Sequence, residues 1–130
     1  MKGRCRMAEN IEDKGNVLKV KADSPDATDQ DRKDSLKKLA GAIAHSLRQH
    51  GDVKVRCFGN ACIGKAAKAI AISRGMVAVH GHDLFQVAYF ITAEMGGQMK
   101  TGICFDCFTH EKEPHIPEPV GREDLSTALQ

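Results

Sequence analysis

The sequence has no tryptophan, few aromatic residues (5%), and no run of about 18 apolar residues, the length that a membrane-spanning helix needs. The core must therefore be aliphatic, and we expect no membrane partner. Lys2, Arg4 and Arg6 are not followed by an apolar run, so the N-terminus does not read as a secretory signal. Neither charge sign dominates, because the net charge is only +2, which neither requires nor excludes an anionic partner.

Cysteine is present in an odd number, five, at irregular spacings, so a disulfide framework is not expected. Reduced thiols in a cytoplasmic protein are the better interpretation. Cys104 and Cys107 form a C-x-x-C on a predicted strand, where residues three apart point to opposite faces. Cys57 and Cys62 are also close in sequence, but we expect buried small apolar side chains, with no metal and no cofactor.

The length of 130 residues suits one domain, and 42% apolar with 28% charged residues is the globular range. Polar residues without periodicity at 1–15 predict a flexible N-terminal arm. Three prolines in the last segment predict a flexible tail over 110–130. The domain itself is expected at 16–109.

Alternation and helical spacing predict six elements in the order β-α-β-α-β-β. Asp29 or Asp31 is expected to cap the first helix, and Gly75 to end the second. A Gly96-Gly97 turn is expected to join the last two strands. This order indicates an α/β two-layer sandwich with a four-stranded mixed sheet and two helices on one face. The expected strands and helices span residues 17–21, 32–50, 53–57, 61–74, 83–94 and 99–108.

Several segments together resemble a known family. They are Leu18-Lys19-Val20, the stretch LAGAIA at 39–44 and the stretch AAKAIAISRG at 66–75. The chain from about residue 16 to 108 is similar to the stage V sporulation protein S family of the Alba-like group. The resemblance implies an Alba-like fold, a homodimer and binding of DNA or RNA. An acidic loop at 23–31 departs from the family's pattern and would weaken binding to nucleic acid.

A phosphate-loop string occurs at residues 59–66, where GNACIGKA fits G-x-x-x-x-G-K between a strand and a helix. The next position, which should be Ser or Thr to hold Mg²⁺, is Ala66. We therefore expect no nucleotide hydrolysis, and no enzymatic activity.

The same segment suggests contacts to phosphate groups. Backbone N–H groups at the start of a helix favour phosphate, and lysines three apart share a helical face. Basic residues on the preceding strand are expected to join this surface and contact a nucleic-acid backbone without reading bases. The candidate residues are Lys54, Arg56, Gly59, Asn60, Lys65, Lys68 and Arg74.

Other interpretations stay open. The basic residues can be an ordinary solvated helix face, and Arg74 can instead complement the helix dipole. The protein can also be a regulatory protein-interaction module, with the Ala-rich second helix as its interface. His80-Gly81-His82 reads as a polar turn. The hairpin aromatics are expected in the sheet core or a dimer interface: Phe85, Tyr89, Phe105 and Phe108.

Overall fold

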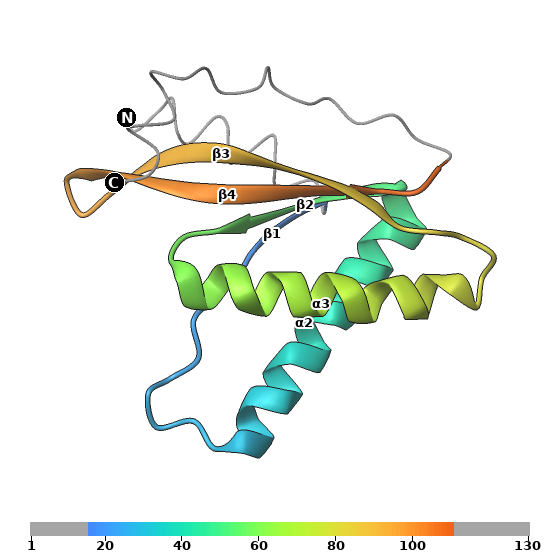
Figure 1. Cartoon of the computed structure of the whole chain (residues 1–130), viewed down its shortest axis with the longest axis horizontal. Helices are drawn as coiled ribbons and strands as arrows, with labels where there is room; N and C mark the ends of the chain where they lie inside the picture. Colours follow the sequence, from blue (N-terminus) through green and yellow to red (C-terminus); the bar gives the residue numbers. More distant parts are fainter. Residues whose placement is uncertain (1–15, 111–130) are drawn as a thin grey trace.

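The computed structural model describes residues 16–110. In chain order the elements are β1 (Val17–Lys19), α2 (Asp29–His50), β2 (Asp52–Cys57), α3 (Asn60–Ala78), β3 (Phe85–Met95) and β4 (Gln98–Phe108). The strands form one sheet in the order β1-β2-β4-β3, with β1 parallel to β2 and the other pairs antiparallel. Both helices lie on the same face of this sheet (Figure 1). The predicted fold class is confirmed.

The predicted arm at 1–15 and nearly all of the predicted tail at 110–130 lie outside the described residues. The elements of the predicted 16–109 domain run from Val17 to Phe108. Within the described part, no helix combines the length and apolar character needed to cross a membrane.

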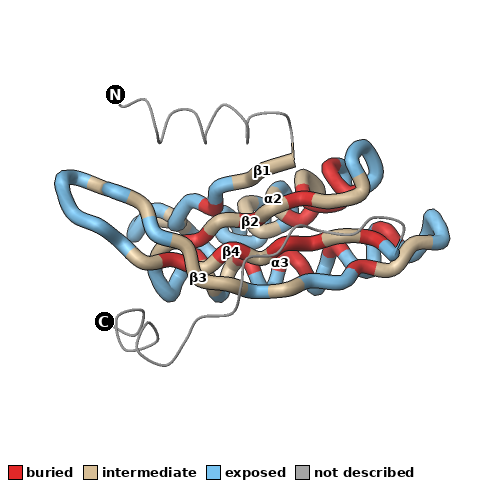
Figure 2. The backbone as a smooth tube through the Cα atoms, turned by 90° about the horizontal axis from the view of Figure 1, so that it is seen from above, coloured by how far each residue is buried: buried red, intermediate tan, exposed pale blue. Residues whose placement is uncertain are grey.

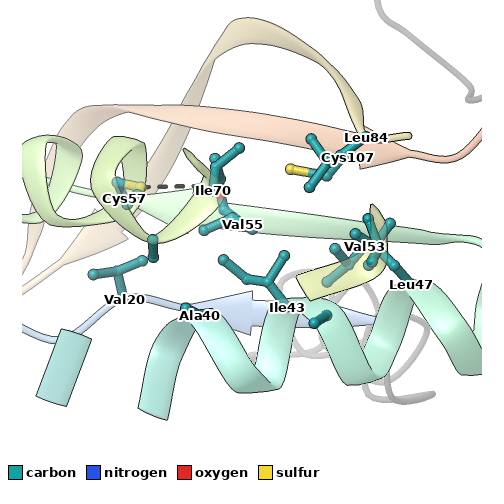
Figure 3. Packing of buried hydrophobic residues seen from close by; sticks show 14 of the residues in the cluster. Val20, Ala40, Ile43, Leu47, Val53, Val55, Cys57, Ile70, Leu84 and Cys107 are labelled. Atoms are coloured by element: carbon teal, nitrogen blue, oxygen red, sulfur yellow. Dashed lines mark hydrogen bonds between the residues drawn. The ribbon is translucent and has the colours of Figure 1, made fainter. Parts of the chain in front are cut away.

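The core lies between the sheet and the helices (Figure 3), and the buried positions are spread along α2, β2, α3 and β4 (Figure 2). Strand β2 alternates strictly, since Val53, Val55 and Cys57 are fully buried while the residues between them are only partly buried. The buried residues of β2 pack against a helix face that includes Ile43 and Leu47. Small residues on α3 let the two helices approach closely. Ser73 is fully buried there, with its hydroxyl oxygen 2.8 Å from the carbonyl oxygens of both Ala40 and Ala69.

The start of α2 differs from the prediction. Thr28 is the N-cap, and neither Asp29 nor Asp31 is. The Thr28 hydroxyl accepts a hydrogen bond from the backbone N–H of Asp31 (3.0 Å), and the Asp31 carboxylate accepts one from the N–H of Thr28 (3.1 Å). This reciprocal capping box satisfies two backbone donors, which explains why the helix begins at Asp29 rather than at residue 32.

The end of α3 also differs, because Gly75 does not terminate it. The helix continues to Ala78, and Val77 is fully buried one turn after Ser73. Burial of that side chain holds the last turn in helical form despite the glycine. The turn that follows contains Gly81, whose φ of 82° suits glycine.

The β3–β4 hairpin agrees with the sequence. Gly96 and Gly97 have φ values of 58° and 80°, the left-handed pair that a tight two-residue hairpin turn requires. The hairpin projects beyond the ends of the helices (Figure 1).

The four described cysteines are free and buried, as predicted. Cys104 lies on the sheet face without helices, and Cys107 belongs to the core on the other face. Burial raises the pKa of the Cys57 and Cys107 thiols to about 12, so both are thiols and not thiolates at neutral pH. Their role is that of small apolar side chains.

Candidate functional site

The predicted basic surface does not form as one patch. Because β2 alternates, Lys54 and Arg56 lie on the face of the sheet away from the helices. Lys65 and Lys68 lie on α3, on the opposite side of the sheet, and Arg74 lies in its second half. The alternation of β2 can be seen in the sequence. With both helices on one face of the sheet, it already implies that Lys54 and Arg56 lie on the other face, away from Lys65 and Lys68.

On the helix-free face, Lys54 is paired within the sheet. Its ammonium lies 2.8 Å from Asp106 Oδ2, and the two residues face each other in register across β2 and β4. The Lys54 side chain is 28% exposed and that of Asp106 is fully buried. The positive charge of Lys54 is therefore paired with a buried carboxylate, and the pair links β2 to β4.

Gly102 of β4 also lies on the helix-free face and shows how closely that face is packed. A Cβ built there would collide with the carbonyl oxygen of Cys57 and would lie 2.6 Å from the Phe58 ring. The ammonium of Lys19 lies 6.0 Å from the centroid of the same ring, within the range of a cation–π contact. Phe58 and Lys19 thus cover this part of the sheet.

A groove of about 500 Å³ lies between the two helices, at the start of α3. The loop between β1 and α2, the first turns of α2 and the first turns of α3 form its walls. Of the predicted residues it brings together Asn60, Lys65 and Lys68. Its lining consists of Ala22, Asp23, Asp29, Arg32, Lys33, Leu36, Asn60, Ala61, Gly64, Lys65 and Lys68.

Lys65 is not the solvent-facing charge that the sequence suggests. Its ammonium donates to the carbonyl oxygen of Lys21 (3.0 Å), to Asp23 Oδ1 (2.9 Å) and to the hydroxyl oxygen of Ser35. Its side chain is only 13% exposed. The pKa of Asp23 is lowered, first by the hydrogen bond from Lys65 and then by a hydrogen bond with the Ser35 side chain. Lys65 joins α3 to the loop between β1 and α2 and to α2 itself. These contacts join residues too far apart in the sequence to be predicted from spacing.

Three other cations of the groove face solvent, and sequence reasoning missed two of them. Lys68 and Lys33 are exposed. Arg32, with a side chain 49% exposed, lies 4.0 Å from Asp23 Oδ2, a carboxylate already bonded to Lys65. The capping residues at 28–31 and the helical spacing of Leu36 place Arg32 and Lys33 on the first turns of α2, but only the packing of α2 against α3 puts them in one groove with Lys68.

Gly59 is the N-cap of α3, with φ 94°, and it provides no side-chain cap. The first turn of α3 contains no acidic residue, so no carboxylate competes there for the backbone N–H groups. The phosphate-loop string is helical from Asn60 onward, and the N–H of Ile63 already donates to Gly59 O. The extended cradle of a nucleotide-hydrolysing loop is therefore not formed.

Arg74 lies outside the groove and is paired with Asp83. Its Nε lies 2.8 Å from Asp83 Oδ1 and its Nη2 lies 3.3 Å from Oδ2. Hydrogen bonding within the pair raises the pKa of Arg74 and lowers that of Asp83. This pair connects α3 to the segment before β3. Among the described residues, no group of three His, Cys, Asp or Glu side chains is placed to hold a metal ion.

The family model of stage V sporulation protein S (SpoVS) matches residues 16–110. The match spans every helix and strand described above, from β1 to β4, and covers well over half of the chain. The chain therefore belongs to the stage V sporulation protein S family and has its Alba-like fold.

Proposed function

We propose that this protein binds DNA or RNA without catalysing a reaction, and that the groove between α2 and α3 contacts the phosphate backbone. One observation carries the proposal: Arg32, Lys33 and Lys68 present exposed positive charge along a single groove. Backbone contacts need accessible positive charge and open geometry, and they need no closed pocket. Membership of an Alba-like family supports this function.

The acidic loop opposes this binding less than its composition suggests. Asp23 is hydrogen-bonded to Lys65 and lies near Arg32, and Asp31 is engaged in the capping box of α2. These pairings reduce the free negative charge beside the groove. Gly59 and Asn60 add backbone donors at the uncapped start of α3, where the helix dipole favours an anion.

The remaining predicted contacts have other roles in this proposal. Lys54 and Arg74 each neutralise a carboxylate, at Asp106 and Asp83 respectively. Arg56 faces away from the groove, so it can contact only a ligand on the other side of the sheet. We therefore assign the backbone contacts to the groove cations.

A fluorescence-anisotropy titration tests the proposal. Labelled single- and double-stranded oligonucleotides would be titrated with the protein at about 50 mM and about 200 mM salt, the range over which phosphate contacts lose affinity. Lys68→Glu and Lys33→Glu are expected to weaken binding by about tenfold or more at low salt. The control, Lys38→Glu, makes the same charge change on α2 at an exposed residue that does not line the groove. Absence of binding at low salt, or equal binding by all variants, would refute the proposal.

A second candidate function is a regulatory protein-interaction module in the cytoplasm that binds no nucleic acid and uses the second helix, α3, as its dimer or partner interface. The observation that favours it is an exposed apolar strip near the C-terminal end of α3: Ile72 (38%), Met76 (37%) and Val79 (80%). Light scattering after size-exclusion chromatography would show a dimer that Met76→Glu dissociates. A dimer with no nucleic-acid binding would favour this function over the first.

A further inference from the structure

We propose that the groove also binds a small phosphomonoester, a molecule in which one terminal phosphate group is attached to an organic body, and that this ligand competes with nucleic acid. Only the competition rests on the proposed function. Binding of the phosphomonoester follows from the groove itself.

The size of the groove fits such a ligand. At about 500 Å³ it falls within the range of small-molecule sites, roughly 300–1,000 Å³. The contacts of Lys65 with Lys21, Asp23 and Ser35 fix the loop wall against both helices, so the groove exists before any ligand arrives. A preformed site avoids the entropic cost of ordering a loop on binding.

The charges of the groove favour a terminal phosphate over a phosphate within a chain. A phosphomonoester carries about −1.5 to −2 charges at pH 7, whereas each backbone phosphate of a nucleic acid carries one. Arg32, Lys33 and Lys68 line the groove from two helices. With Lys65 they give four positive charges against the two carboxylates of Asp23 and Asp29, so the lining has a net charge of +2, which a dianion matches better than a singly charged phosphate.

The rest of the lining suits an organic body. Leu36, Ala61 and Gly64 give an apolar wall, and Asp29 offers a carboxylate that can accept hydrogen bonds from hydroxyl or amino groups. Gly64 leaves open space at this wall, because it has no side chain and a Cβ built there would have no atom of the protein within 4 Å. Nucleoside monophosphates and sugar phosphates share the required chemistry.

Isothermal titration calorimetry of the full chain tests the proposal with four probes: AMP, glucose 6-phosphate, inorganic phosphate and adenosine. We expect at least one phosphomonoester to bind at micromolar concentrations, and at least tenfold more tightly than inorganic phosphate or adenosine. The ester that binds more tightly shows whether the groove prefers a nucleoside monophosphate or a sugar phosphate. Lys68→Met should weaken binding about tenfold, and AMP or glucose 6-phosphate should displace a labelled oligonucleotide.

Two glycine variants supply the steric control. Gly64→Leu should abolish ester binding by filling the groove, and Gly75→Leu, on the exposed side of the same helix and outside the groove, should not. The inference is overturned if neither ester binds below about 1 mM, if inorganic phosphate binds as tightly as the esters, or if Gly64→Leu leaves binding unchanged. Ester binding without any nucleic-acid binding would instead count against the proposed function and the competition alone.

Discussion

The sheet around β2 and β4 and the groove between the helices each contain a predicted phosphate-binding lysine and a glycine, yet they use them differently. In the sheet, Lys54 neutralises buried Asp106, and Gly102 lies beneath the Phe58 ring. In the groove, Lys68 is exposed and Gly64 borders open space. Sequence shows only that a cation or a glycine is present. Whether a charge is free to meet a ligand depends on its partner, and whether a glycine leaves room depends on what packs over it.

The largest effect is expected in the sheet above pH 9. The pKa of the Cys57 and Cys107 thiols rises from 9.0 in the unfolded chain to about 12 in the fold, mainly because burial disfavours the thiolate. Between these values the unfolded state has lost the proton and the native state has kept it, so stability falls as pH rises. The slope is about 1.4 kcal/mol per pH unit for each thiol. Stability is unaffected by these groups below pH 9.

Urea denaturation at pH 8, 9, 10 and 11 checks this loss, which should reach about 5 kcal/mol for the two thiols together at pH 11. Replacing both thiols, with Cys57→Ala and Cys107→Ala, should flatten the dependence on pH while lowering stability at pH 8. An equally steep loss in the double variant would show that other groups cause it.

The next largest effect separates the two glycines. Gly102→Ala should destabilise the fold by about 3 kcal/mol, because the added methyl group meets the Cys57 carbonyl, which cannot move without disturbing β2. Gly64→Ala should instead stabilise it by up to about 1 kcal/mol, because alanine favours a helix and nothing obstructs its methyl group. Thermal denaturation compares them, and similar melting temperatures for both variants would contradict this difference in packing.

A smaller loss of stability is expected when Lys54 is changed to Met. The substitution leaves the fully buried Asp106 carboxylate without its partner, which should cost about 2 kcal/mol because the lysine of the pair is partly exposed. A second change, Asp106→Asn, removes the uncompensated charge and should recover part of the loss. Lys68→Met, with no ion pair to a described residue, should change stability by less than about 0.5 kcal/mol. If both lysine variants unfold alike in urea, Lys54 is not structural.

The fold could be predicted because its signals are local. Alternation in β2, helical spacing in α2 and the Gly96-Gly97 turn each depend on residues close in sequence. The candidate site could be predicted only in part. Asn60 and Lys68 do line a groove, but the engagement of Lys65 depends on Asp23 and Ser35, which are 42 and 30 residues away.

Arg32 and Lys33 were missed for a related reason. Their position on α2 follows from the sequence, but their place in one groove with Lys68 depends on how α2 packs against α3. That packing is set by buried contacts such as the one between Ser73 and Ala40, which no spacing rule reveals.

The salt dependence of nucleic-acid binding tests the central claim most directly. For double-stranded DNA, each phosphate contact contributes about 0.9 to the slope of the logarithm of the association constant against the logarithm of the salt concentration. Replacing Arg32, Lys33 and Lys68 together with Met should reduce that slope by about 2 to 3 while the melting temperature stays nearly unchanged. A slope equal to that of the unmodified protein would show that the groove does not contact the backbone.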